Sequence, residues 1–222
     1  MPELHWPTWL IHHQCSFCSR LQEAPGFCQQ CRHKLELNGP APHGGEPLRW
    51  RALSHYGGTW RQLIWTLRRK PKARLIRALA VELAQQLPHF SEWAQLCPIP
   101  PRQGHPKGPP QWLAGAVSQR SGWPQATLLQ RHRACLGQHH LNRQQRAENL
   151  RGVFAAAPAQ NPNATVLLID DVRTSGATGQ AAAEALQQAG YSVAGLLCLS
   201  STPIGGCGDG LSLPLAQQGL PG

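Results

Sequence analysis

The sequence has 222 residues, which suffices for one medium-sized domain or for a domain with a small appendage. With 41% hydrophobic and 14% charged residues, 22 Gly and 20 Pro, the composition excludes a wholly disordered, collagen-like or coiled-coil protein. The net charge of +10 indicates an anionic partner, and the lack of a long apolar run or a signal-peptide pattern predicts a soluble, cytoplasmic protein without membrane insertion.

Half of the eight cysteines lie near the N-terminus in two pairs of identical spacing. These pairs are Cys15-x-x-Cys18 and Cys28-x-x-Cys31. Two tight turns of this kind can supply the four thiolate ligands of a tetrahedral Zn²⁺ ion, and His12, His13 and His33 are nearby alternative ligands. Because protein atoms would fill all four positions of the ion, we predict a structural zinc ribbon over residues 1–40. The remaining cysteines show no paired spacing and are expected to pack as small apolar side chains: Cys97, Cys135, Cys198 and Cys207.

The rest of the chain is predicted to form a second domain over residues 48–200, followed by a flexible Gly/Pro-rich tail over 201–222. Turn-forming residues between 38 and 47 predict a linker in front of this domain. In chain order, the apolar spacing predicts helices over 59–67 and 73–87, a strand over 95–99, a helix over 111–120 and a strand over 127–130.

Positive charge is concentrated in the middle of the chain. Between Arg49 and Arg151 there are 17 Lys and Arg residues and three acids, an excess of 14 positive charges. Tryptophans are interleaved with these basic residues, among them Trp50, Trp60, Trp65, Trp112 and Trp123. Aromatic side chains in a basic groove favour contact with single-stranded DNA, whose bases stack on them. The alternatives are that the arginines serve solubility and that the tryptophans pack in the core.

The clearest structural unit comes near the C-terminal end. Residues 165–169 are continuously apolar, as expected of a strand that is buried on both faces of a parallel sheet. An alanine-rich helix over 178–189 and a second buried strand over 191–199 follow. This strand–turn–helix–strand order predicts an α/β fold in which helices flank a parallel sheet.

Two of the three aspartates, Asp170 and Asp171, directly follow the strand over 165–169. Adjacent carboxylates repel each other, so their placement indicates function at the sheet edge where open α/β folds bind ligands. A turn follows whose backbone N–H groups and hydroxyls are suited to a phosphate group: Arg173, Thr174, Ser175, Gly176, Ala177 and Thr178. Carboxylates beside a phosphate-binding turn favour a phosphorylated sugar as ligand. The alternative is that residues 173–178 form an ordinary helix cap after an ordinary strand.

Other phosphate-binding motifs are absent. The pattern G-x-x-x-x-G-K-[ST] of nucleotide hydrolases does not occur, and the turn after Asp171 contains no lysine. The dinucleotide pattern G-x-G-x-x-G is also missing from this turn.

The segment Ile169–Thr178 resembles the phosphoribosyl pyrophosphate (PRPP) motif of type I phosphoribosyltransferases. Further segments extend the resemblance to the ComF family: the cysteine pairs, Tyr56-Gly-Gly, Pro98-Ile-Pro100, Arg131-x-Arg133 and Asn149-Leu-Arg-Gly-Val-Phe154. That family joins a zinc ribbon to a phosphoribosyltransferase-like domain and is linked to DNA uptake in natural competence. The chain departs from it at Lys107–Gln111, which is shortened, and at Ser175, where the family often has threonine.

The resemblance implies roles for particular residues. Asp170 and Asp171 would hold the ribose hydroxyls as catalytic residues, and residues 173–178 would hold the 5′-phosphate. An arginine-rich hood would contact the pyrophosphate: Arg102, Arg131, Arg133, Arg143 and Arg146. Mg²⁺ is expected to bind together with PRPP. The resemblance implies an accessory factor in DNA uptake that binds PRPP or a similar phosphorylated sugar, with single-stranded DNA and a competence helicase as further partners. The alternative is an active Mg-dependent phosphoribosyltransferase.

Overall fold

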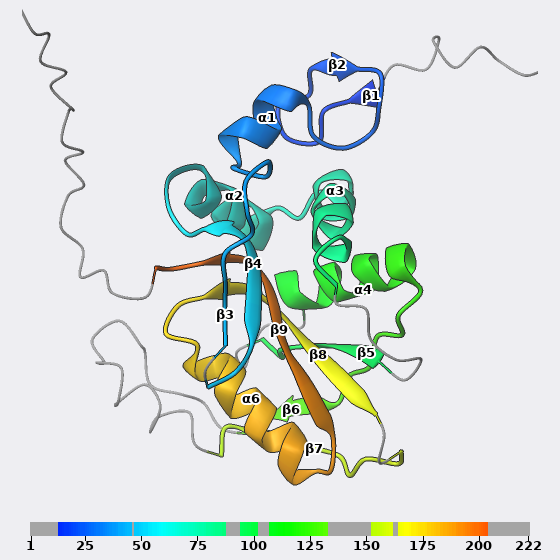
Figure 1. Cartoon of the computed structure of the whole chain (residues 1–222). Helices are drawn as coiled ribbons and strands as arrows, with labels where there is room; N and C mark the ends of the chain where they lie inside the picture. The colour runs from blue at the N-terminus through cyan, green and yellow to red at the C-terminus, as the bar shows by residue number, and fades with distance from the viewer. Residues whose placement is uncertain are drawn as a thin grey trace, which may run out of the picture.

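We analysed a computed structural model of the whole chain (Figure 1). The structure describes residues 13–45, 47–87, 94–101, 107–132, 152–161 and 164–203. Within these ranges, no helix is both long and apolar enough to cross a membrane.

A five-stranded sheet forms the centre of the molecule, with the strand order β3-β4-β9-β8-β5 (Figure 1). Its strands are β3 (His43–Gly44), β4 (Trp50–His55), β5 (Ala94–Pro98), β8 (Thr165–Arg173) and β9 (Ser192–Ser201). The pairs β4–β9, β9–β8 and β8–β5 are parallel, and only the edge strand β3 runs antiparallel to its neighbour. The predicted α/β class with a helix-flanked parallel sheet is therefore confirmed.

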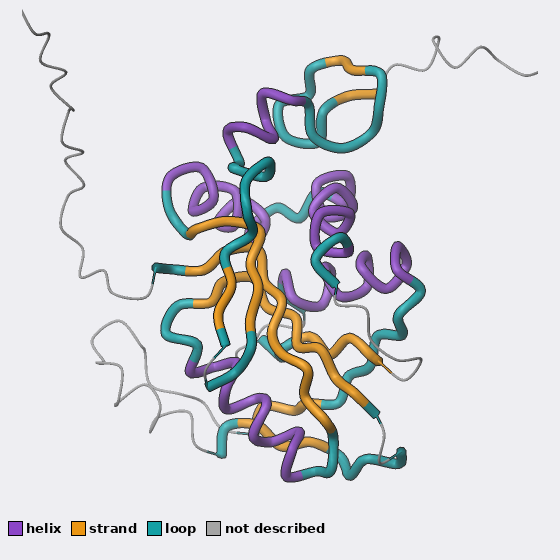
Figure 2. The backbone as a smooth tube through the Cα atoms, viewed as in Figure 1, coloured by secondary structure: helices purple, strands orange, loops and turns teal. Residues whose placement is uncertain are grey.

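Three helices cover one face of this sheet, and a fourth helix and a small two-stranded sheet cover the other (Figure 2). The first layer contains α2 (Gly58–Arg69), α3 (Ala73–Ala84) and α4 (Pro109–Ser121), which share a core with Leu167, Ile169 and Leu197 of the sheet. The second layer contains α6 (Ala177–Gln188) and the two-stranded sheet of β6 (Leu129–Arg131) and β7 (Phe154–Ala156). Alternate residues of each strand face the two layers, so both faces are apolar.

The N-terminal module packs directly on the first helical layer. It consists of the hairpin β1 (His13–Gln14) and β2 (Leu21–Gln22) and the short helix α1 (Gln29–Lys34). Leu35, which is fully buried, joins the same core as Leu63 and Leu67 of α2. Arg32 of α1 forms an ion pair with Glu82 of α3, with Nη1–Oε1 and Nη2–Oε2 distances of 2.5 and 3.2 Å. Figure 1 shows the module lying against α2 and α3, at the far end of the molecule from α6.

Most predicted elements are present, with shifted ends. The helix predicted over 73–87 ends at Ala84, and the strand predicted over 165–169 continues to Arg173. Five short elements (β1, β2, α1, β3 and β7) and β4 were not predicted, because none of them carries a long periodic pattern. Part of the predicted linker over 38–47 is strand β3, whose His43 pairs with Arg51 of β4.

Candidate functional site

Asp170 and Asp171 lie within the last part of β8 instead of in a turn behind it. Asp170 pairs with Cys198 and Val172 with Ser200 of β9, so the ladder continues past both acids. Consecutive strand residues leave the backbone on opposite faces. The side chain of Asp170 therefore leaves β8 on the sheet face that α6 covers, and the side chain of Asp171 leaves it on the face that α2 covers. Both lie at the carboxyl edge of the sheet, as predicted.

Asp171 is buried and forms an ion pair with a residue that sequence reasoning did not include. Its Oδ2 accepts a hydrogen bond of 2.7 Å from Nε of Arg68, near the end of α2. Asp171 is 5% exposed, whereas the Arg68 side chain is 54% exposed. The hydrogen bond to Asp171 raises the pKa of Arg68. The basic run Arg68–Lys72, between two predicted helices, was the available sequence signal.

Asp170 has no comparable cationic partner among the described residues. Its Oδ1 accepts a hydrogen bond of 2.8 Å from the backbone N–H of Asp171. The residue keeps a partly exposed surface, although protein atoms crowd its carboxyl group. Burial and the neighbouring charge of Asp171 raise the pKa of Asp170 well above its usual range. Asp170 is therefore a partly exposed acid with a raised pKa, the kind of group found at ligand-binding sites.

The turn after β8 leads directly into the first turn of α6. Gly176 precedes this helix with φ of 81°, a left-handed conformation that favours glycine. Ser175 Oγ accepts the backbone N–H of Ala177 at 3.4 Å, and the Thr174 carbonyl accepts the Thr202 hydroxyl at 3.0 Å. Thr174 is exposed, and residues 175–178 are partly exposed. The N-terminus of the 12-residue helix α6 thus opens toward solvent beside Asp170.

The side chain of Arg173 packs beneath this turn. Arg173 is 6% exposed, and its guanidinium lies 4.2 Å from the centre of the Trp50 ring. Its Nη1 donates to Ser201 Oγ at 3.4 Å, and its Nη2 lies 3.1 Å from the point where a Cβ on Gly176 would sit. The Arg173 side chain therefore supports the turn from below, and a contact between residue 173 and a phosphate stays a prediction.

The segment Pro98–Pro100, which carries part of the resemblance to the ComF family, lies beside β8. Pro98 pairs with Ile169, and the backbone N–H of Ile99 donates to the Ile169 carbonyl at 2.9 Å. Arg131 reaches this segment from β6: its Nη2 donates to the Pro100 carbonyl at 3.5 Å, and its guanidinium lies 4.6 Å from the centre of the Phe154 ring. One predicted hood arginine therefore adjoins the predicted site. The others lie outside the described residues: Arg102, Arg133, Arg143 and Arg146.

The shortened segment Lys107–Gln111 supports the same edge. Gln111 Nε2 donates to the Ile99 carbonyl at 3.0 Å, and its Oε1 accepts the backbone N–H of Gly108 at 3.0 Å. These bonds hold the start of α4 against the loop that follows β5.

A cavity of about 610 Å³ adjoins Arg68 on the α2 side of the site. Tyr56, Trp65 and Thr66 are among the residues that line it. Trp65 is 60% exposed, and Arg69 lies over its ring at 4.6 Å from the centre. By contrast, Trp50 and Trp60 are 8% and 2% exposed, so the prediction that these two tryptophans stack on bases is wrong. Both side chains fill the core instead.

The four predicted metal ligands converge. The thiol sulfurs of Cys15, Cys18, Cys28 and Cys31 all lie within 4.8 Å of one another, and none of these cysteines forms a disulfide. The Cys18 and Cys28 sulfurs are 3.8 Å apart. Zn–S bonds of about 2.3 Å in a tetrahedron place sulfurs roughly 3.8 Å apart, so the donor set fits Zn²⁺.

Backbone hydrogen bonds prepare Cys15 as a thiolate. Burial opposes its ionisation, but N–H groups of Cys28, Cys18 and Phe17 lower the pKa of Cys15 to about 6. The Cys28 N–H donates to the Cys15 sulfur at 3.4 Å. Burial and the neighbouring thiols raise the pKa of Cys31. A thiolate is the form that binds metal, so the cluster is suited to a structural cation.

No protein-family model and no curated protein matches the chain. Among solved structures, the UMP synthase of Leishmania donovani is similar with 20% identity and a TM-score of 0.38, over 57% of this chain and 22% of that chain. This chain thus spans less than a quarter of that protein's length. The adenine phosphoribosyltransferase of Leishmania tarentolae matches with 14% identity and a TM-score of 0.35, over 59% of this chain and 72% of that chain.

The adenine phosphoribosyltransferase of Leishmania donovani matches with 13% identity and a TM-score of 0.38, over 78% of this chain and 93% of that chain. At these TM-scores the similarities carry no argument about the ligand or the activity of this chain. The α/β architecture and the four-cysteine cluster stand on the chain's own geometry.

Proposed function

We propose that the carboxyl edge of β8 binds a phosphorylated sugar such as PRPP, as the resemblance to the ComF family and to type I phosphoribosyltransferases implies. The observation that carries the proposal is that Asp170 lies near the end of β8, on the face of α6, and that the partly exposed turn that starts α6 follows this strand directly. Backbone N–H groups at a helix N-terminus favour a phosphate group, and a carboxylate accepts hydrogen bonds from sugar hydroxyls. Thr174, Ser175 and Thr178 add hydroxyl donors around the same turn.

Arg131 and residues 99–101 would supply the other half of the proposed site. Arginine is suited to pyrophosphate because its guanidinium offers several charge-assisted donors at once. Mg²⁺ would bind to phosphate oxygens of the ligand and to the Asp170 carboxylate, because it prefers oxygen ligands. Asp171 can join the sugar contacts only if its hydrogen bond to Arg68 is exchanged for one to the ligand.

Titration calorimetry with PRPP, with and without Mg²⁺, tests this proposal. We expect Mg²⁺-dependent binding that weakens at least about tenfold in Asp170→Asn, because a charge-assisted hydrogen bond is lost. Glu184→Gln is the matched control, since it removes one negative charge from the exposed face of α6. Absence of PRPP binding, or equal binding by Asp170→Asn, contradicts the proposal.

Two functions are compatible with a bound phosphorylated sugar. The primary candidate is a ligand-binding accessory factor in DNA uptake, and the alternative is a phosphoribosyltransferase that passes through a ribosyl cation. Nearby carboxylates would stabilise such a cation. Release of pyrophosphate from PRPP on addition of an acceptor base distinguishes the enzyme from the binding protein.

Single-stranded DNA contact is a second candidate function, and the exposed face of α2 favours it. Trp65 is exposed there beside Arg61 and Arg69. Base stacking on an aromatic ring contributes about 1–3 kcal/mol, so we expect Trp65→Ala to weaken oligo(dT) binding about tenfold. Phosphate contacts also predict that the affinity falls steeply with salt. Fluorescence anisotropy at two salt concentrations measures both effects, and a salt-independent affinity contradicts nucleic-acid binding.

A further inference from the structure

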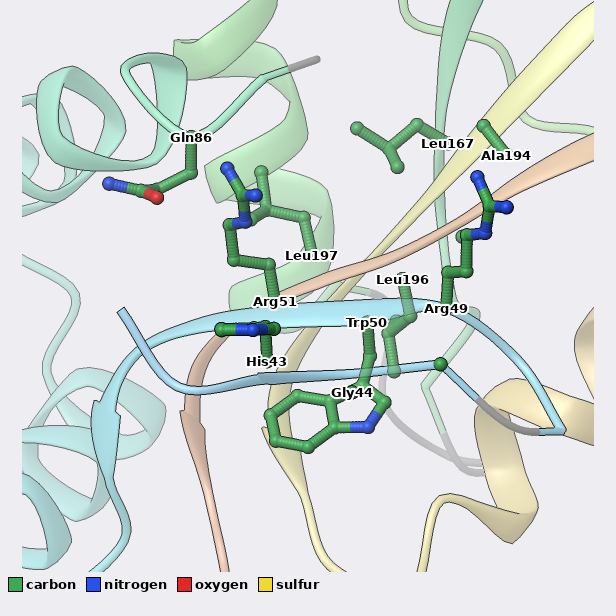
Figure 3. A pocket seen from close by; sticks show the side chains of 12 residues that line it. His43, Gly44, Arg49, Trp50, Arg51, Gln86, Leu167, Ala194, Leu196 and Leu197 are labelled. Atoms are coloured by element: carbon green, nitrogen blue, oxygen red, sulfur yellow. The ribbon is translucent and has the colours of Figure 1, made fainter. Parts of the chain in front are cut away.

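A cavity of about 400 Å³ lies toward the amino ends of β4, β8 and β9, away from Asp170 and the turn before α6 (Figure 3). Leu167, Ala194 and Leu197 form part of its lining, on the sheet face that α2, α3 and α4 cover elsewhere. Gln86, just beyond α3, lines another side. Pockets of this size and apolar lining are typical of small-molecule sites.

Small residues and a β-bulge create the space. The ladder between β8 and β9 shifts register between Val166 and Leu167, opposite Val193 and Gly195. Gly195 has φ of 151°, and a Cβ there would lie 2.6 Å from the Arg49 carbonyl oxygen. Because that oxygen accepts the backbone N–H of Leu196 at 2.8 Å, the bulge is held in place and only glycine suits it. Bulges often occur beside binding sites, where they re-aim side chains.

Two arginines give the rim of the cavity a positive charge. Arg49 and Arg51 are exposed, and Figure 3 shows both side chains on the same side of β4 as Leu197. No described carboxylate lies within ion-pair distance of either guanidinium. Arg51 belongs to a strand with neighbours on both sides, where side chains facing a covered sheet layer are usually apolar. An exposed arginine at this position shows that the helical layer leaves this end of the sheet open.

His43 completes the rim but contributes less to anion recognition. It pairs with Arg51 across the β3–β4 ladder, and its Nδ1 lies 3.1 Å from the Ala41 carbonyl oxygen. The two guanidinium groups are therefore the principal donors for an anion.

We propose that this cavity is a second ligand site, for a small molecule that carries one carboxylate, sulfonate or phosphate group on a flat apolar body. The anionic group binds Arg49 and Arg51, and the flat body lies on Leu167, Ala194 and Leu197. The site is separate from the proposed sugar site, because it lies toward the opposite end of the strands and includes neither Asp170 nor the turn before α6.

The test uses anilinonaphthalene sulfonate, a fluorescent flat anion, with the full zinc-loaded chain. We expect one bound probe per chain and an affinity that falls at least about tenfold in Arg49→Gln/Arg51→Gln, because charge-assisted hydrogen bonds are lost. Ala194→Phe should abolish binding by filling the cavity. The uncharged analogue N-phenylnaphthylamine should bind at least tenfold more weakly than the anion, in line with the loss of these bonds.

Two controls separate this site from general surface binding and from the sugar site. Arg77→Gln removes an exposed arginine from α3, and Asp170→Asn alters the sugar site; neither should change probe affinity. If Ala194→Phe fails to fold, the arginine double variant still decides the question. Unchanged affinity in that double variant, or equal binding of the uncharged analogue, overturns the proposal. A loss caused by Asp170→Asn overturns it as well, since the probe would then occupy the sugar site.

Discussion

Removal of the metal from the four-cysteine cluster is expected to destabilise the whole chain, not only its first 40 residues. The N-terminal module shares its core with α2 and α3, and polar contacts also fix it there. Trp60 Nε1 donates to the Leu35 carbonyl at 2.9 Å, Arg74 Nη2 donates to the Cys15 carbonyl at 2.9 Å, and Arg32 pairs with Glu82. Release of the module would remove these partners from the Trp60 N–H and the Glu82 carboxylate.

Cys31→Ser tests this expectation. We expect loss of one equivalent of Zn²⁺ per chain and a decrease of at least about 3 kcal/mol in the free energy of unfolding, since structural zinc contributes directly to folding. Metal analysis and urea unfolding measure the two effects. Cys97→Ala is the control, because this buried thiol lies in β5, outside the cluster, and its removal should leave zinc content unchanged. A clean preparation without zinc, or an unfolding curve insensitive to a chelator, contradicts the metal site.

The sequence predicts the α/β class and the long elements because their patterns are strong. A five-residue apolar run, residues 165–169, and an alanine-rich helix after it allow few alternatives, and β8 and α6 are both present. The edge strand β3 has two residues, and β4 alternates only partly, so neither gives a recognisable period. The position of β4 in the sheet depends on its pairing with β9, which local sequence does not encode.

The composition of the candidate site was predictable, but its charge pairing was not. Asp170, Asp171 and the following turn are contiguous in sequence, and continuity alone brings them together. Arg68 lies 103 residues from Asp171 in the chain, so only the packing of α2 against the sheet reveals their hydrogen bond. That bond balances the charge of Asp171, so one of the two adjacent acids has a structural role. Asp170 forms no ion pair within the part of the chain that the structure describes, and it is therefore the stronger functional candidate.

Asn substitutions of the two acids are expected to change stability in opposite directions. Asp171→Asn loses a charged hydrogen bond to Arg68 and should lower the free energy of unfolding by about 1 kcal/mol at neutral pH. Asp170→Asn removes a crowded charge beside Asp171 and should raise the free energy of unfolding by about 1 kcal/mol at pH 8, as often occurs when a functional acid is removed. Urea unfolding of the zinc-loaded variants measures both changes.

The increase in the free energy of unfolding caused by Asp170→Asn must itself increase with pH. Burial and the charge of Asp171 raise the folded-state pKa of Asp170, so the folded wild type holds this proton more tightly than the unfolded chain does. The wild type is therefore fully stabilised by that proton below the unfolded pKa of about 4, and it loses the stabilisation as pH rises through the folded pKa. The advantage of Asp170→Asn should be near zero at pH 4 and should grow toward pH 8. An advantage that is constant with pH, or one that grows toward pH 4, would show that Asp170 is not a crowded acid and would remove the electrostatic reason for placing the ligand beside it.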